Sequence, residues 1–183
     1  TIVKIGKLQE ICDHLSLLGQ SNESSKLEAL KDHLPNTLVE GNKAVIFSRF
    51  SRMVKILEKE LKEYDPLVLI GETENREEVL KKFQEDDKHQ ILIMTQAGGE
   101  GINLFRANLF YFFDSPWSYG RFLQLCGRIH RLGQTKPVVI YSLRVKGTVD
   151  VAVKKILYDK AELSVNVLGD RSLTMTDIRQ MLL

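Results

Sequence analysis

Short, continuously apolar segments alternate with longer amphipathic segments along most of the chain. The apolar segments are too short for amphipathic helices and therefore predict buried strands, at 44–47, 67–70, 90–94, 109–113 and 138–143. Between them, apolar positions recur at helical spacing, which predicts helices over about 51–63, 73–85 and 119–126. This alternation predicts an α/β fold with a doubly wound, mainly parallel sheet and flanking helices.

Helical patterns also precede the predicted sheet. An amphipathic lead-in helix is expected from about Ile2 to Leu18, because Gly19 is a usual helix-stop residue. A second helix is expected to begin at Ser25, since Ser25 and Glu28 have the spacing of a capping box.

Two further helices are expected after the last strand. Thr148 can cap a long helix to about residue 163, and Thr176 can cap a short terminal one. The pattern thus predicts a lead-in helix (1–24), the sheet domain (25–147) and a short C-terminal helical appendage (148–183).

The composition fits an ordinary globular domain. The chain has 183 residues, of which 43% are hydrophobic, enough to fill a core. The apolar runs are far below the roughly 20 residues that span a bilayer, and no signal peptide is evident, so no membrane partner is expected. Neither end reads as a natural boundary, and we expect an excised piece of a larger protein.

The cysteines and histidines argue against a disulfide framework and a metal site. Cys12 and Cys126 are the only cysteines and lie far apart in the sequence. This argues against a disulfide scaffold and is typical of proteins in a reducing environment. We therefore expect an intracellular protein, in the nucleus of a eukaryote or in the cytoplasm or nucleoid of a bacterial or viral system. Cys12 and His14 have no second Cys/His pair at zinc-ligand spacing, so no metal site is expected.

Positive charge is concentrated in the last third of the chain. The formal net charge is only +2, yet from Arg121 to Lys155 eight basic residues stand against the single acid Asp150. Such a stretch is either a solvated basic face or a phosphate-binding surface, and charge alone leaves both open.

Candidate chemistry lies in the segments that follow the predicted strands, because ligands of open α/β sheets bind beyond the carboxyl ends of strands. The loop after 90–94 contains Thr95 and three glycines, Gly98, Gly99 and Gly101. Glycines let backbone amides approach an anion closely, although a plain tight turn explains them equally well. A P-loop sequence, GxxxxGK[ST], does not occur in the 183 residues.

Two arginines and a glutamine form the strongest candidate site. Gln124, Arg128 and Arg131 are spaced i, i+4 and i+7, which places them on one face of a continuous helix. Two guanidiniums can stabilise the negative charge that develops on a phosphoryl group during its transfer. The alternative is a surface helix with salt bridges.

The segment 124–134, QLCGRIHRLGQ, strongly resembles motif VI of superfamily-two helicase-like ATPases in the form found in Swi/Snf remodellers. The segment 95–104, TQAGGEGINL, is similar to motif V of that family, and 43–50, KAVIFSRF, to motif IV. Residues 25–27, Gly71 and 114–117 also lie along the chain in the order expected for that family. Over nearly its whole length, the chain resembles the second RecA-like lobe of a Swi/Snf-type DNA translocase.

This resemblance implies roles for the candidate residues. Arg128 and Arg131 would act as arginine fingers on ATP, which the first RecA-like lobe of the same protein would hold with Mg²⁺, and Gln124 would couple nucleotide to DNA. Gly101 and Asn103 would lie near the nucleotide. Contacts with the backbone of double-stranded DNA, which position without reading sequence, would come from Ser48, Arg49, Thr95, Gly98 and Gly99.

The sequence departs from the family pattern at two positions. Gly127 stands where many remodellers carry Asp, and Gln96 stands where a basic residue is frequent. Neither change removes an arginine of motif VI, but Gln96 is expected to weaken the grip on DNA.

The nucleotide-binding half of an active site is missing. Besides the absent P-loop, no Walker B acid follows a buried strand. The segment 86–89, DDKH, mimics a DxxH box but follows an amphipathic helix, so a solvated turn is expected. We therefore expect the chain to be inactive as an ATPase without the first lobe.

Two other functions compete with the motor lobe. A non-catalytic DNA-binding or regulatory module would have no use for arginines at the spacing of Arg128 and Arg131. A strand-separating DNA or RNA helicase of the same superfamily is less consistent with the ending HRLGQ (130–134) and the loop AGGEGINL (97–104).

Overall fold

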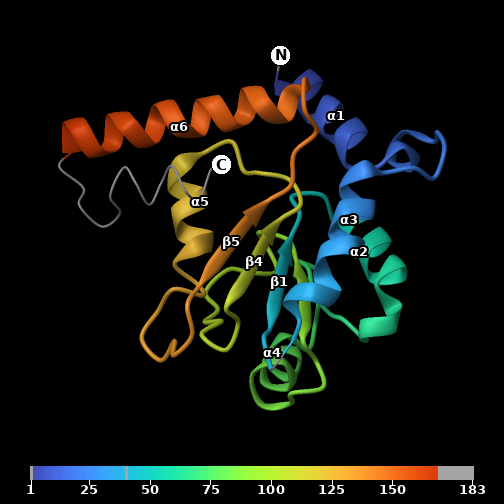
Figure 1. Cartoon of the computed structure of the whole chain (residues 1–183), viewed down its shortest axis with the longest axis vertical. Helices are drawn as coiled ribbons and strands as arrows, with labels where there is room; N and C mark the ends of the chain where they lie inside the picture. The colour runs from blue at the N-terminus through green and yellow to red at the C-terminus, as the bar shows by residue number, and fades with distance from the viewer. Residues whose placement is uncertain (1, 40, 169–183) are drawn as a thin grey trace.

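The computed structural model describes residues 2–39 and 41–168 as one parallel sheet covered by helices (Figure 1). The elements follow in the order α1 (Ile2–Asp13), η1 (Leu15–Leu18), α2 (Ser25–Thr37), β1 (Ala44–Phe47), α3 (Ser51–Glu60), η2 (Lys62–Tyr64), β2 (Leu67–Leu69), α4 (Arg76–Glu85), β3 (Ile91–Met94), β4 (Leu109–Phe112), α5 (Tyr119–Cys126), β5 (Val139–Ser142) and α6 (Val149–Leu168). The strand order is β2-β3-β1-β4-β5, and every neighbouring pair is parallel. The predicted parallel α/β sheet is therefore confirmed.

Side chains that alternate along each strand form two cores, one on each face of the sheet. In β1, Val45 and Phe47 belong to the core that includes residues of α4, α5 and α6, whereas Ala44 and Ile46 belong to the core with α2 and α3. Figure 1 shows α2 and α3 on one side of the sheet and α5 on the other. Because both faces are covered, β1 is apolar at every position.

The helices α1 and α6 pack together at the edge of the sheet where the strands end (Figure 1). Their junction contains a buried charge cluster, in which Lys26 Nζ lies 2.8 Å from Asp13 Oδ1 and 2.8 Å from Asp150 Oδ2. None of the three side chains is more than 3% exposed. The predicted division at residues 24/25 and 147/148 stays a prediction, since the three parts share this cluster.

Two predictions about the first helices are wrong in detail. The lead-in helix ends at Asp13, because His14 is extended and its ring nitrogen accepts a hydrogen bond from the Ser16 N–H at 3.3 Å, which starts the separate turn η1. The cap of α2 is Ser24 rather than Ser25, since the Ser24 hydroxyl accepts from the Leu27 N–H at 3.1 Å.

Later helix limits also differ. α3 ends at Glu60, and α4 begins at Arg76 because the Thr73 hydroxyl closes the turn after β2 by accepting from the Ile70 N–H at 3.0 Å. Thr148 accepts from the Asp150 N–H at 3.3 Å, as a cap of α6 should, but α6 extends to Leu168. The expected helix at Thr176 lies outside the described residues.

Candidate functional site

The loop after β1 is built around the buried carboxylate of Asp114, which follows β4. The Ser48 hydroxyl donates to this carboxylate at 2.5 Å, and the Arg49 N–H donates to its two oxygens at 3.0 and 3.1 Å. Burial raises the pKa of Asp114, and these hydrogen bonds oppose the rise. Ser48 is fully buried and its hydroxyl shapes the loop, so its predicted contact with the DNA backbone stays a prediction.

Arg49 is held by α1 and by an aromatic ring. Its guanidinium lies 4.0 Å from the ring centre of Trp117 and donates to Gln9 Oε1 at 2.6 Å. The Trp117 indole N–H donates to the same oxygen at 2.5 Å, and Gln9 is fully buried. Burial lowers the pKa of Arg49. Arg49 therefore offers a half-buried cation at the carboxyl edge of the sheet.

The first half of the loop 95–108 folds upon itself. The Gly98 N–H donates to Thr95 Oγ1 at 3.3 Å, and the Gly99 N–H donates to the Thr95 carbonyl at 2.9 Å. A Cβ on Gly98 would lie 1.9 Å from the Leu69 carbonyl oxygen, so only glycine allows this approach to β2.

The predicted contacts of Thr95, Gly98 and Gly99 with the DNA backbone stay predictions. Thr95 is only 4% exposed and both glycines are buried, and the two amides already donate within the loop. Both glycines lie in a tight turn, which is the alternative that the sequence left open, and Gly98 also packs closely against β2.

The second half of this loop crosses from the carboxyl edge to the amino edge of the sheet. Gly101, with φ of 72°, and Asn103 are exposed along the way. The Leu104 N–H donates to the Arg128 carbonyl at 2.9 Å. The Asn108 N–H donates to the carbonyl of Lys43, just before β1, at 3.1 Å. The loop thus joins the two edges of the sheet.

The arginines of motif VI follow α5 rather than lying on it. The helix ends at Cys126, and the Arg128 N–H donates to the Leu125 carbonyl at 3.1 Å, in a tighter turn. The predicted helix face shared by Gln124, Arg128 and Arg131 is therefore wrong. A helix that connects parallel strands runs antiparallel to them, so its end places motif VI at the amino edge, away from the predicted carboxyl edge.

Arg128 and Arg131 both lie in the turns that follow α5, at this amino edge. Arg128 Nη1 donates to the Ile102 carbonyl at 3.2 Å, between Gly101 and Asn103. Burial lowers the pKa of Arg128; the charge of Glu100 opposes this shift and the charge of Arg131 adds to it. Arg131 and Gln124 are exposed. The structure therefore brings Arg128, Arg131 and the two candidate nucleotide residues to one region.

Two residues that contact the candidate motifs were missed by the sequence analysis. Gln134 fixes the turn of motif VI, since its Nε2 donates to the Ala107 carbonyl at 2.6 Å and to the Ile129 carbonyl at 3.2 Å. Arg121 is exposed beside motif V: in the amide orientation that satisfies both side chains, Gln96 accepts from its guanidinium at 2.5 and 3.1 Å. The family-specific ending of motif VI contains Gln134, but no pattern pairs Arg121 with Gln96.

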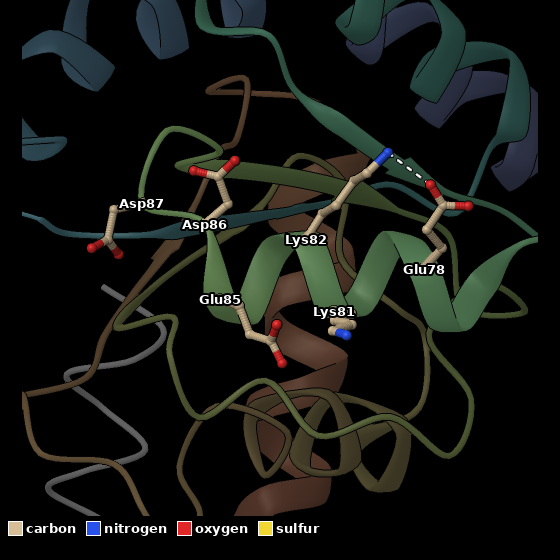
Figure 2. Close-up of a pocket in the computed structure, with 6 residues that line it drawn as sticks. All are labelled: Glu78, Lys81, Lys82, Glu85, Asp86 and Asp87. Atoms are coloured by element: carbon tan, nitrogen blue, oxygen red, sulfur yellow. Dashed lines mark ion pairs between the residues drawn. The ribbon is translucent and has the colours of Figure 1, made fainter.

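A depression of about 430 Å³ lies along α4, apart from motif VI (Figure 2). Figure 2 shows the Lys82–Glu78 ion pair, 2.8 Å long, among the charged side chains that line it. Asp86 and Asp87 are 45% and 77% exposed, which confirms the predicted solvated turn.

The positive charge of the two motif VI arginines suits an anionic ligand. Within 2–39 and 41–168, no three His, Cys, Asp or Glu side chains gather so that they could hold a metal. The guanidiniums of Arg128 and Arg131 fit phosphate oxygens, whereas a Mg²⁺ ion would need carboxylate ligands from elsewhere. In the same part of the chain, no helix is long and apolar enough to cross a membrane.

Comparison with known proteins gives consistent matches. The model of the family "Helicase conserved C-terminal domain" matches residues 25–133. The chain is 33% identical over 159 residues to the chromatin-remodeling ATPase INO80 of Mycosarcoma maydis, covering 84% of this chain and 8% of that protein. It is 34% identical over 164 residues to the DNA repair protein RAD5A of Arabidopsis thaliana, covering 87% and 16%.

Among solved structures, the Sulfolobus solfataricus SWI2/SNF2 ATPase core in complex with dsDNA has a TM-score of 0.74 and 30% identity, covering 98% of this chain and 41% of that one. The chain spans only 8% to 16% of the length of these two curated relatives.

Proposed function

Because the chain belongs to the helicase conserved C-terminal domain family, as the C-terminal lobe of a Snf2-type ATPase, we propose that it is the second motor lobe of an ATP-dependent translocase on double-stranded DNA. A first RecA-like lobe of the same protein holds ATP and Mg²⁺. Closure of the two lobes completes the active site, and the chain alone hydrolyses no ATP. In a eukaryote such a protein would work in the nucleus.

One observation carries this proposal, the placement of Arg128 and Arg131 in the turns after α5, where the charge of Arg131 acts on Arg128. Two like charges held near one another destabilise the chain at rest, and an anion placed between them reverses the sign of the interaction. The γ-phosphoryl group develops such negative charge during transfer. Arg128 is fixed through Ile102 and Leu104, so little reorganisation is needed when ATP arrives.

The remaining candidate residues follow from this placement. Gly101 and Asn103 flank the carbonyl that holds Arg128, which supports a role for them beside the nucleotide. Gln124, the first residue of motif VI, is exposed on α5 about one turn before Arg128, and would couple nucleotide to the DNA edge. Mg²⁺, when bound, would neutralise phosphate charge from the first lobe, since this chain offers it no ligand cluster within the described residues.

We infer that DNA lies along the carboxyl edge of the sheet, on Arg49 and Arg121. Ser48, Thr95, Gly98 and Gly99 build the loops beneath it. Gln96 stands where the family often has a basic residue. The guanidinium of Arg121 lies against the Gln96 amide and supplies the positive charge there. The relative solved with dsDNA supports a duplex as the partner.

Displacement of a third DNA strand from a triplex tests the proposal. The full-length protein should displace the strand only with ATP, should not separate a forked duplex, and should lose displacement on Arg131→Ala. Efficient unwinding of the fork would favour a strand-separating helicase, and DNA binding without ATP-dependent displacement would favour a non-catalytic module.

A further inference from the structure

Helix α4 lies beside the loop 95–108 and is bonded to its main chain at two places. Arg76, the first residue of α4, donates through Nη2 to the Gly98 carbonyl at 2.8 Å and to the Glu100 carbonyl at 3.1 Å. Gln84 donates through Nε2 to the Asn103 carbonyl at 2.6 Å. The two donors are eight residues apart, which corresponds to about 12 Å along a helix. The loop is thus held over the stretch that connects the two edges of the sheet.

The helix is itself anchored to the sheet. Lys43, which precedes β1, is only 1% exposed, and its Nζ donates to the Phe83 carbonyl at 2.6 Å and to the Asp86 carbonyl at 2.7 Å. Beyond the end of α4, Asp87 pairs with Arg106 at 2.8 Å and adds a link to the end of the loop. The loop therefore lies against a fixed support.

Only one of the two polar atoms of the Gln84 amide has a hydrogen-bond partner among the described residues. Its Oε1 is buried and has no hydrogen-bond partner among the described residues, an arrangement that costs free energy. An apolar side chain of similar size would avoid this cost but could not donate to Asn103. The bond to the loop offsets the cost.

We propose that Arg76 and Gln84 are positioning residues that fix the loop 95–108 between the DNA edge and Arg128, so that DNA binding at one edge sets the arginine at the other. The inference rests on the proposed function. Neither residue lies in motifs IV, V or VI. The link to Arg128 is direct, since the residue after Asn103 donates its N–H to the Arg128 carbonyl.

Hydrogen exchange on the 183-residue chain tests the structural part of this inference. Arg76→Ala and Gln84→Leu should speed exchange of the Gly99 and Leu104 amides about tenfold, the equivalent of one lost hydrogen bond. Lys81→Ala, on an exposed position of the same helix (Figure 2), should change neither amide. Unchanged exchange in the first two variants, or an equal change in the Lys81 control, would overturn the inference.

Turnover of the full-length protein tests the functional part. Arg76→Ala and Gln84→Leu should lower DNA-stimulated kcat about tenfold while DNA-free turnover stays within twofold. The double variant should lose less than the product of the single losses, because both residues hold one loop. Arg76→Lys should recover part of the stimulation, because an ammonium can donate to the same carbonyls.

An equal fall of DNA-free and DNA-stimulated turnover would mean general structural damage and would contradict a positioning role. A wild-type protein without DNA-stimulated turnover would refute the proposed function, and the exchange experiment would still decide whether α4 holds the loop.

Discussion

Replacement of Lys26 by Met should destabilise the fold more than any substitution of a surface lysine. Lys26 Nζ lies within ion-pair distance of both Asp13 and Asp150, and all three side chains are buried. Met fills a similar volume without charge, so Lys26→Met leaves two buried carboxylates without their cation. Removal of one partner from a buried pair typically costs about 3–5 kcal/mol.

The expected change in melting temperature follows from that cost. For a chain of this size each kcal/mol corresponds to roughly 2–4 °C, so Lys26→Met should melt about 10 °C below wild type. Lys31→Met is the matched control, because Lys31 pairs with Glu60 at the surface, where the two side chains are 38% and 29% exposed. Surface pairs contribute about 0–1 kcal/mol, and the control should melt within about 3 °C of wild type.

The effect should also depend on pH. Burial, and then repulsion from Asp114, raises the pKa of Asp13, whereas Lys26 lowers it. An acid whose folded pKa is raised destabilises the folded state above that pKa, and the cost vanishes as the pH falls toward the unfolded value of about 4. Lys26→Met removes the opposing cation, so its deficit should shrink between pH 7 and pH 4.

Thermal unfolding followed by circular dichroism at the two pH values checks this reasoning. If Lys26→Met and Lys31→Met had the same melting temperature at pH 7, the cost of about 3–5 kcal/mol for removing Lys26 from the buried cluster would be refuted. A deficit that grows as the pH falls would refute the assigned role of Asp13.

Three other predictions follow from the structure. The purified 183-residue chain should show no DNA-stimulated ATP hydrolysis, because it has no P-loop; turnover in contaminant-free material would contradict this. Its DNA binding should be weak, independent of sequence and steeply salt-dependent, and Arg121→Ala should reduce the slope of log K against log salt by about 0.9; an unchanged slope would exclude Arg121 from the interface. Gly98→Ala should lower the free energy of unfolding by about 1–3 kcal/mol, because the added Cβ would lie 1.9 Å from the Leu69 carbonyl oxygen. The control Gly120→Ala, at an open position of α5, should be neutral or slightly stabilising. Equal melting temperatures of the two variants would refute the packing role of Gly98.

The sheet was predictable because buried parallel strands are continuously apolar. The strand limits from 44–47 to 138–143 agree with the structure within one residue at each end. Helix starts were less predictable, because adjacent serines such as Ser24 and Ser25 have the same capping chemistry and only the fold selects between them. The family resemblance is confirmed by the match over residues 25–133.

The placement of the site could not be predicted from local pattern. Whether Arg128 lies on a helix depends on where α5 ends, and its position at the amino edge depends on the path of that helix across the sheet. The need for glycine at Gly98 arises from Leu69, 29 positions earlier, which only the pairing of β2 with β3 brings near. Arg76 and Gln84 lie outside every motif. Both side chains donate to main-chain carbonyls of the loop 95–108, and such contacts leave no pattern in the sequence.

The most direct measurement compares DNA-stimulated kcat with DNA affinity in the full-length protein for Arg128→Ala, Arg131→Ala and Arg121→Ala. An arginine finger contributes roughly 10³ to 10⁵ in rate, so the two motif VI variants should lose nearly all turnover and keep their nucleotide and DNA affinity. Lysine at these two positions should rescue poorly, because an ammonium lacks the planar fork of a guanidinium. Arg121→Ala should weaken DNA binding and keep turnover at saturating DNA. Near-normal kcat with lost DNA affinity in the Arg128 and Arg131 variants would contradict the account and make motif VI part of a DNA-binding face.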